Sequence, residues 1–100
     1  MSRAKTAEEV REDFLQNVKS ICRYWANIEG RNDLEKCEGV AFSILNIFDG
    51  TSSAFPTMDI ILRPHPEDKQ YHIDNGMDYY EDGQMINDCY LHSLFNRVKS

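Results

Sequence analysis

The chain has 100 residues, of which 41% are apolar and 28% charged, and its net charge is −6. These values are typical of one globular domain, residues 1–100, and argue against a disordered chain. The acidic balance disfavours direct nucleic acid binding, because phosphate binding needs a clustered basic face. The charged N-terminus is unlike a signal peptide, and the longest apolar stretch is too short to span a membrane. We therefore expect a soluble, cytoplasmic protein without a membrane partner, with residues 1–5 disordered.

Two amphipathic helices are predicted in the first half of the chain. Thr6 and Glu9 have the spacing of a capping box, and an apolar stripe with helical spacing follows them. Residues 32–35 have the pattern of a second capping box, with Asn32 as N-cap and Glu35 three residues later. A second apolar stripe continues from there to Phe48, and Asp-Gly at 49–50 ends the helix. The short link between the two helices predicts an antiparallel helix hairpin. The first stripe, which we expect to form core, consists of Val10, Phe14, Val18, Ile21, Cys22, Trp25 and Ile28.

One strand and two further helices are predicted in the second half. Residues 57–63 are rich in aliphatic side chains and lie between two prolines, which is typical of a strand. The partner of this strand is either a segment that the pattern does not reveal, for which the surroundings of Tyr79 are one candidate, or another subunit, which would make the protein a homodimer. Pro66 and the acids after it begin a short helix that ends at Asn-Gly 75–76, and the last helix is predicted over 84–98. The predicted fold class is α+β, mainly helical.

The cysteines and the acidic loop do not predict a metal site. Cys22, Cys37 and Cys89 are odd in number, contain no Cys-x-x-Cys pair and fall in helical apolar stripes. We therefore expect buried free thiols in a reducing compartment. Residues 78–83 match a calcium-binding EF-hand loop at its first, fifth and sixth positions. The third ligand position is Tyr80, however, and the twelfth, which needs a glutamate, is Cys89. We expect neither a metal ion nor a cofactor.

The charge of the chain is concentrated in residues 67–88. This segment has seven acids and one lysine and so carries −6, which leaves the remaining residues neutral in sum. Tyrosine and methionine lie within and beside it; both are enriched in protein interfaces, and charge steers a partner of opposite sign. The other interpretation is that the aromatic side chains cover the core while the acids face water. The predicted interaction face consists of Asp74, Asp78, Tyr79, Tyr80, Glu81 and Asp82.

A small enzyme is the alternative hypothesis, with His65, Asp68 and His92 acting as metal ligands or as an acid–base pair. His65 and His72 are seven residues apart, whereas two ligands on one helix usually stand three or four apart. The chain also lacks a nucleophile motif and a glycine-rich phosphate loop. We therefore assign no catalytic residue and favour a non-enzymatic regulator that presents residues 67–88 to a basic protein partner. A nucleic-acid-binding protein whose site the acids occupy, as a phosphate mimic would, is one such partner.

Four short motifs stand out: Glu-Gly-Val-Ala-Phe-Ser-Ile-Leu at 38–45, Asp-Gly at 49–50, Pro-His-Pro-Glu-Asp-Lys at 64–69 and Leu-His-Ser-Leu-Phe at 91–95. Together they resemble a family of small uncharacterised bacterial and phage-associated proteins, over residues 31–95. The resemblance implies no activity, cofactor or catalytic residue. It directs attention to five positions, which are Glu38, His65, Pro66, Asp68 and His92.

Overall fold

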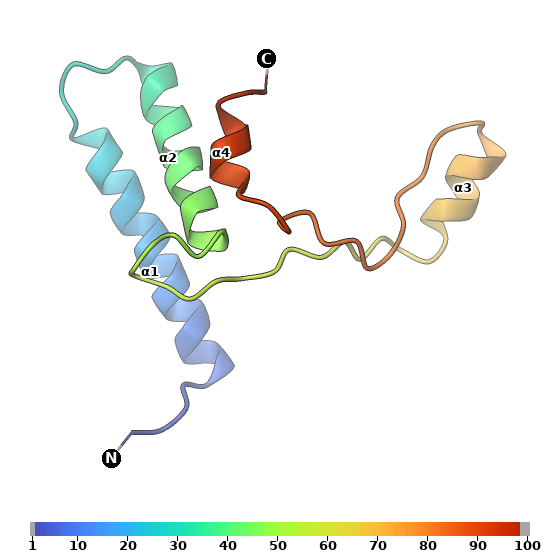
Figure 1. Ribbon diagram of the computed structural model, residues 1–100, viewed down its shortest axis with the longest axis horizontal. Helices are drawn as coiled ribbons and strands as arrows, with labels where there is room; N and C mark the ends of the chain where they lie inside the picture. The colour runs from blue at the N-terminus through green and yellow to red at the C-terminus, as the bar shows by residue number, and fades with distance from the viewer. Residues whose placement is uncertain (1, 99–100) are drawn as a thin grey trace.

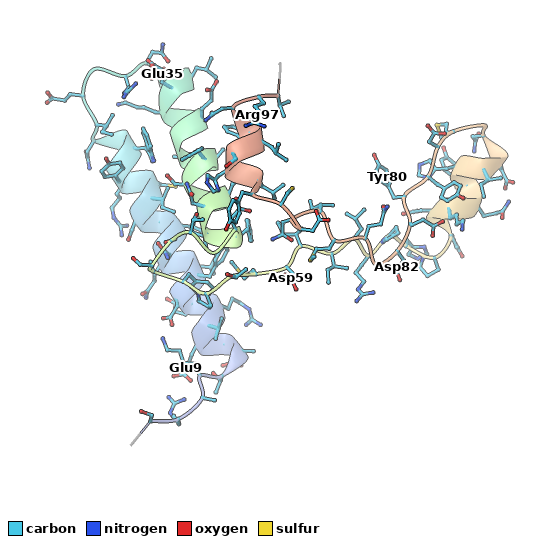
Figure 2. The ribbon with its side chains drawn as sticks, viewed as in Figure 1. Glu9, Glu35, Asp59, Tyr80, Asp82 and Arg97 are labelled. Carbon is cyan, nitrogen blue, oxygen red and sulfur yellow. The ribbon has the colours of Figure 1, made fainter. Side chains whose placement is uncertain are left out.

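The computed structural model describes residues 2–98 and contains four helices there. A helical body is formed by α1 (Ala7–Ala26), α2 (Asp33–Phe48) and α4 (Leu91–Phe95), and an extended arm leads away from it to α3 (Asp68–Asp74) at the far end (Figure 1). Figure 2 adds the side chains and shows Asp59 near the body, with Tyr80 and Asp82 closer to α3. The arm and the body are therefore separate surfaces of one chain.

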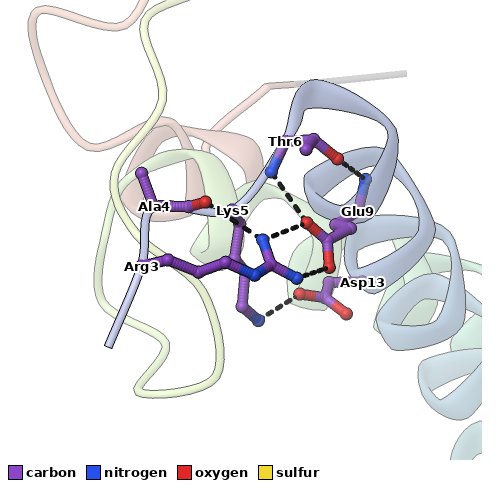
Figure 3. Close-up of polar contacts among 6 residues, drawn as sticks. All are labelled: Arg3, Ala4, Lys5, Thr6, Glu9 and Asp13. Carbon is purple, nitrogen blue, oxygen red and sulfur yellow. Dashed lines mark hydrogen bonds and ion pairs between the residues drawn. The ribbon is translucent and has the colours of Figure 1, made fainter. Parts of the chain in front are cut away.

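The start of α1 confirms the predicted capping box. The Thr6 hydroxyl accepts a hydrogen bond from the Glu9 N–H at 3.2 Å, and the Glu9 carboxylate accepts from the Thr6 N–H at 2.9 Å (Figure 3). In the segment expected to be disordered, Arg3 binds both carboxylate oxygens of Glu9, at 2.8 and 2.7 Å, and Lys5 pairs with Asp13. The Arg3 guanidinium and then the Thr6 N–H lower the pKa of Glu9 to about 2. The negative charge at the helix N-terminus therefore persists into acid.

The helix hairpin is also confirmed, because α1 and α2 run antiparallel and pack side by side (Figure 1). The Trp25 indole lies across Gly39 of α2 and donates a hydrogen bond to the Ser43 hydroxyl at 3.0 Å. At the other end of the hairpin, the Phe14 ring is 5.9 Å from the Phe48 ring and 5.7 Å from the Phe55 ring. Aromatic contacts therefore join α1 to α2 at both ends.

The core is smaller than the apolar stripes predict. Ile47 and Phe55 are the buried hydrophobic residues in the described part of the chain, and α1 has no buried residue. Most of the predicted α1 stripe, including Trp25, is half-buried, while Val10 is 38% exposed. Among the helices of residues 2–98, only α2 packs against this stripe, with Phe55 added from the loop after α2, because much of the chain extends into the arm instead of covering the hairpin. The stripe is thus a contact surface and only in part a core.

The prediction of buried cysteines is wrong, because Cys22, Cys37 and Cys89 are all free and exposed. Cys22 and Cys37 line one shallow groove between α1 and α2, beside Trp25. A helical stripe about 100° wide needs neighbours on both flanks to be buried throughout, and this hairpin supplies one. Cys89 lies outside the helices, in the segment that leads back from the arm to α4.

The predicted strand finds its partner within the chain, but not near Tyr79. Residues 57–63 run antiparallel to 83–87, with a bridge between Ile61 and Met85. The Leu62 N–H donates to the Gln84 carbonyl at 2.9 Å, and the Ile86 N–H donates to the Ile60 carbonyl at 3.0 Å. This pairing is too short to form a sheet, so residues 2–98 are mainly helical, and the α+β class is supported only by this ladder.

The two predicted helices of the second half are shorter than the sequence suggests. The prediction of a helix over 84–98 is wrong, because residues 83–87 belong to the ladder and only Leu91–Phe95 are helical. Backbone groups that bond to a neighbouring strand cannot also bond within a helix. The short helix is confirmed as α3, but it begins at Asp68, two residues after Pro66, and ends before Asn75 and Gly76 as expected.

The arm makes the molecule elongated. Its radius of gyration is 17.4 Å, whereas a compact domain of this length has about 13 Å. The accessible surface is 8137 Å², whereas a compact monomer of the same mass exposes about 5,900 Å². About 2,200 Å² of surface is therefore available beyond what a compact fold would leave in water.

Candidate interaction surface

The predicted interaction face lies on the arm. We define the acidic arm as residues 57–87, which comprise the two paired segments, α3 and the loops between them. It contains seven carboxylates and two basic side chains, so it carries −5 of the chain's −6. Every residue from 73 to 86 is exposed. The charge of the protein is therefore displayed on a protruding element and not on the helical body.

Two basic residues of the arm organise three of the six predicted residues. Lys69 of α3 pairs with Glu81 at 3.1 Å and lies 4.7 Å from the centre of the Tyr79 ring. The Glu81 carboxylate, and to a lesser extent Tyr79, raise the pKa of Lys69. Arg63 lies 3.5 Å from Asp82, and both side chains are well exposed. Exposed pairs of this kind contribute little to stability, so a partner's cations can replace them at small cost.

Within residues 2–98, the other three predicted residues form no ion pair or cation–π contact. Asp74 accepts a hydrogen bond from the Gln70 amide at 2.7 Å. Asp78 has no ion pair or hydrogen bond within residues 2–98, and the Tyr80 side chain is 67% exposed. The arm therefore brings Tyr79 and Glu81 together at Lys69 and leaves Asp74, Asp78 and Tyr80 open to solvent.

The residues of the enzyme hypothesis are not brought together. His65 and Asp68 stand at the start of α3, where the His65 Nδ1 accepts from the Glu67 N–H at 3.2 Å. His92 belongs to α4 in the helical body, at the other end of the arm (Figure 1). Glu38 is exposed on α2, in a shallow hollow beside Phe95 and the residues after it. No common site contains these side chains.

His92 has a partner that sequence reasoning did not assign to it. Asp49, which directly follows α2, accepts from the His92 N–H at 2.8 Å and from the Leu91 N–H at 3.0 Å, and its carboxylate lies 2.6 Å from the His92 Nδ1. Burial raises the pKa of Asp49, but these hydrogen bonds outweigh burial and the pKa is lowered. Asp49 thus caps the N-terminus of α4 across the fold.

Asn87 is the second residue that sequence reasoning missed. Its side-chain oxygen accepts from the Ile60 N–H at 2.8 Å, and its amide donates to the Met58 carbonyl at 2.6 Å. It therefore fastens the two segments of the arm together next to the body. Its position just after Ile86, within an apparent helical stripe, gave no local signal of this role, because both partners are distant in sequence.

Comparisons with known proteins add no relative. No protein-family model, no curated protein and no solved structure matches the chain. The resemblance carried by the four motifs therefore stays a prediction. Within residues 2–98, no cluster of three or more His, Cys, Asp or Glu side chains is arranged to hold a metal ion. In the same part of the chain, every helix is too short or too polar to cross a bilayer.

Proposed function

We propose that this protein is a non-enzymatic interaction domain whose acidic arm binds a basic protein partner. The observation that carries the proposal is the separation of the arm from the body, with most of the net charge and three exposed tyrosines on it. Tyr71 is 61% exposed, Tyr79 42% and Tyr80 67%. A tyrosine in this setting offers apolar area and a hydroxyl at low entropic cost, while the surrounding carboxylates attract cations.

The disposition of the carboxylates favours binding over catalysis. Catalysis by histidine and carboxylate needs both groups in one pocket, where their pKa values can be shifted. On the arm they are dispersed over an exposed surface, and the cationic partners that they do have are exposed as well. Such a surface suits a partner that supplies positive charge from outside, because exposed charges mainly accelerate the encounter.

The partner can be identified by site-specific crosslinking in cells that produce the protein. Tyr80 is replaced by a photo-crosslinking phenylalanine analogue, and the captured protein is identified by mass spectrometry. Tyr24, which is 62% exposed on α1, is the matched control because it differs from Tyr80 in location and not in exposure. We expect a basic protein to be captured from position 80 and not from position 24.

The purified partner is then tested against a neutralised arm. Asp74→Asn, Asp78→Asn, Glu81→Gln and Asp82→Asn together should slow association at low salt by roughly tenfold or more and flatten its salt dependence. The control neutralises four exposed acids outside the arm, which are Glu8, Glu12, Glu29 and Asp33. Equal association rates for the two variants would contradict the proposal, and the acids would then only keep the surface hydrated.

A further inference from the structure

In the arm, residues 57–63 pair with 83–87 along one side, and the backbone groups on the other side of 57–63 have no strand beside them within residues 2–98. The even-numbered residues of the first segment direct their backbone toward the second segment. The Met58 carbonyl accepts from the Asn87 amide, the Ile60 N–H donates to the Asn87 side-chain oxygen, and the Leu62 N–H donates to the Gln84 carbonyl. Since Ile61 and Met85 form the non-hydrogen-bonded pair of the ladder, the backbone of the odd-numbered residues faces the other way. Within residues 2–98 the N–H groups of 59, 61 and 63 donate no hydrogen bond. An open strand edge of this kind is a template for another strand.

We propose that this edge pairs with the same edge of a second copy of the chain, antiparallel and centred on Ile61. A two-fold axis at Ile61 places Ile61 of one copy opposite Ile61 of the other. It also places Asp59 of each copy opposite Arg63 of the other copy. Opposite charges directly across a strand pair stabilise it, so the edge is complementary to itself in this register. Pro56 and Pro64 occupy even-numbered positions, so neither removes a donor from the open edge.

Arg63 is available for this contact. Its ion pair within the chain, with Asp82, has a distance of 3.5 Å, and the two side chains are 73% and 63% exposed. The Asp59 side chain has no ion pair or hydrogen bond within residues 2–98. The monomer therefore leaves one member of the predicted pair without a cation and the other weakly held.

The same register extends an apolar contact across the axis. Ile61 and Met85 lie opposite each other on one face of the ladder and are 42% and 41% exposed. Pairing about Ile61 turns this exposed pair into a continuous row of four apolar side chains over four strands. An isolated two-stranded ladder is marginally stable in water, whereas three or more strands with an apolar face are stable, so association supplies what the arm lacks.

The accessible surface is sufficient for such a dimer. Each chain exposes about 2,200 Å² more than a compact monomer of its mass, and a stable interface buries about 800 Å² per partner. The excess surface of one chain is therefore larger than the area that a stable interface buries on each partner.

The test reverses the charge of Asp59 or of Arg63, the two residues that face each other across the proposed interface. We expect the 100-residue protein to sediment as a dimer. Asp59→Arg and Arg63→Asp should each raise the dissociation constant about tenfold or more, because each variant sets like charges opposite each other. An equimolar mixture of the two variants should form a heterodimer with wild-type affinity, since the arginine introduced at position 59 of one chain then faces the aspartate introduced at position 63 of the other. The double variant D59R/R63D should also dimerise. Asp82→Asn is the matched control and should leave the dimer intact.

A backbone variant tests the same edge independently of charge. Ile61→Pro removes the two central hydrogen bonds of the proposed interface, while the Ile61 N–H has no partner to lose within residues 2–98. We expect a monomer with an unchanged circular dichroism spectrum. A monomeric wild-type protein would overturn the proposal, as would single variants that stay dimeric or a mixture that fails to associate.

These outcomes are separable from those of the proposed function. The neutralised arm retains Asp59 and Arg63 and should stay dimeric, whereas Asp59→Arg retains Tyr80 and the acids around it and should still crosslink to the basic partner. Dimerisation can therefore be lost while binding of the basic partner is still measured, and the reverse.

Discussion

Gly39 and Trp25 set how closely α1 and α2 approach. A Cβ atom at Gly39 would lie 2.5 Å from two carbons of the indole ring, well inside van der Waals contact. The half-buried Trp25 ring fills the space that the missing side chain leaves. The glycine is thus required for packing, although a glycine in the middle of a helix costs about 1 kcal/mol relative to alanine.

Gly39→Ala should therefore destabilise the protein in spite of its better helix propensity. Crowding at a packed site costs about 1–3 kcal/mol, which exceeds the gain of about 1 kcal/mol from propensity. Urea denaturation followed by circular dichroism measures the difference. Glu38→Ala, one residue earlier on the exposed side of α2, is the control and should change the free energy of unfolding by less than about 0.5 kcal/mol. A stabilised Gly39→Ala variant would show that Trp25 does not lie on α2.

Asp49 gives the unfolding free energy a dependence on pH. Its pKa in the folded protein is below the ordinary value of 3.8, so its stabilising contribution is complete above that value and is lost as the pH falls below it. Asp49→Asn should cost about 1–3 kcal/mol near neutral pH, because an amide cannot accept all three hydrogen bonds. The difference between the variant and the wild type should shrink below pH 3.8. Asp88→Asn, an exposed control, should leave the free energy unchanged; a pH-independent difference for Asp49→Asn would point to a steric cause.

At the scale of elements, the two segments of the arm are joined by a short antiparallel pairing and by the Asn87 side chain, which we call the Asn87 clamp. Gly83 has φ +86°, in a region that side-chain-bearing residues avoid, and the chain turns there from the loop after α3 into the ladder. Only a few backbone hydrogen bonds join the two segments, and Asn87 adds two more at 2.8 and 2.6 Å. The clamp lies where the arm joins the helical body, so it holds residues 57–63 and 83–87 side by side at that point.

Asn87→Ala should open the arm without melting the body. Loss of both hydrogen bonds costs about 1–3 kcal/mol locally, and the amides of Leu62 and Ile86 should exchange with solvent roughly tenfold faster or more. Hydrogen–deuterium exchange read by mass spectrometry or NMR measures this, with the amides of α2 as an internal reference. Asn75→Ala is the matched control, because within residues 2–98 the Asn75 side chain bonds only to the Tyr71 carbonyl, inside α3 and its cap. Faster exchange throughout α1 and α2 would mean that the body and the arm fold as one unit.

At the scale of the whole molecule, the arm sets the dimensions. Small-angle scattering of the Ile61→Pro variant, which we expect to be monomeric, should give a radius of gyration near 17.4 Å, well above the value of about 13 Å for a compact domain. A larger radius for the wild type at the same concentration is expected from the proposed dimer. A value near 13 Å for the variant would mean that the arm folds back against the helices and covers part of the exposed apolar surface.

The sequence by itself determined the features whose partners lie within a few residues. Both capping boxes, the stop at Asp49-Gly50 and the short helix α3 could be predicted, because a cap joins groups three residues apart and a glycine supplies a local conformation. The hairpin of α1 and α2 followed from two stripes and a short link. The concentration of charge in residues 67–88 is likewise a property of the sequence alone.

Only the tertiary structure decided what each stripe and segment contacts. Ile86 begins an apolar stripe with helical spacing, yet residues 83–87 pair with a segment more than twenty residues earlier. Backbone hydrogen bonds join the two segments, and the Asn87 side chain binds the backbone of Met58 and Ile60. The exposure of the three cysteines and the half-burial of Trp25 depend on how much of the chain returns to cover the hairpin. Periodicity identifies an apolar face, but burial needs a second surface against it, and in this chain that surface extends away as the arm.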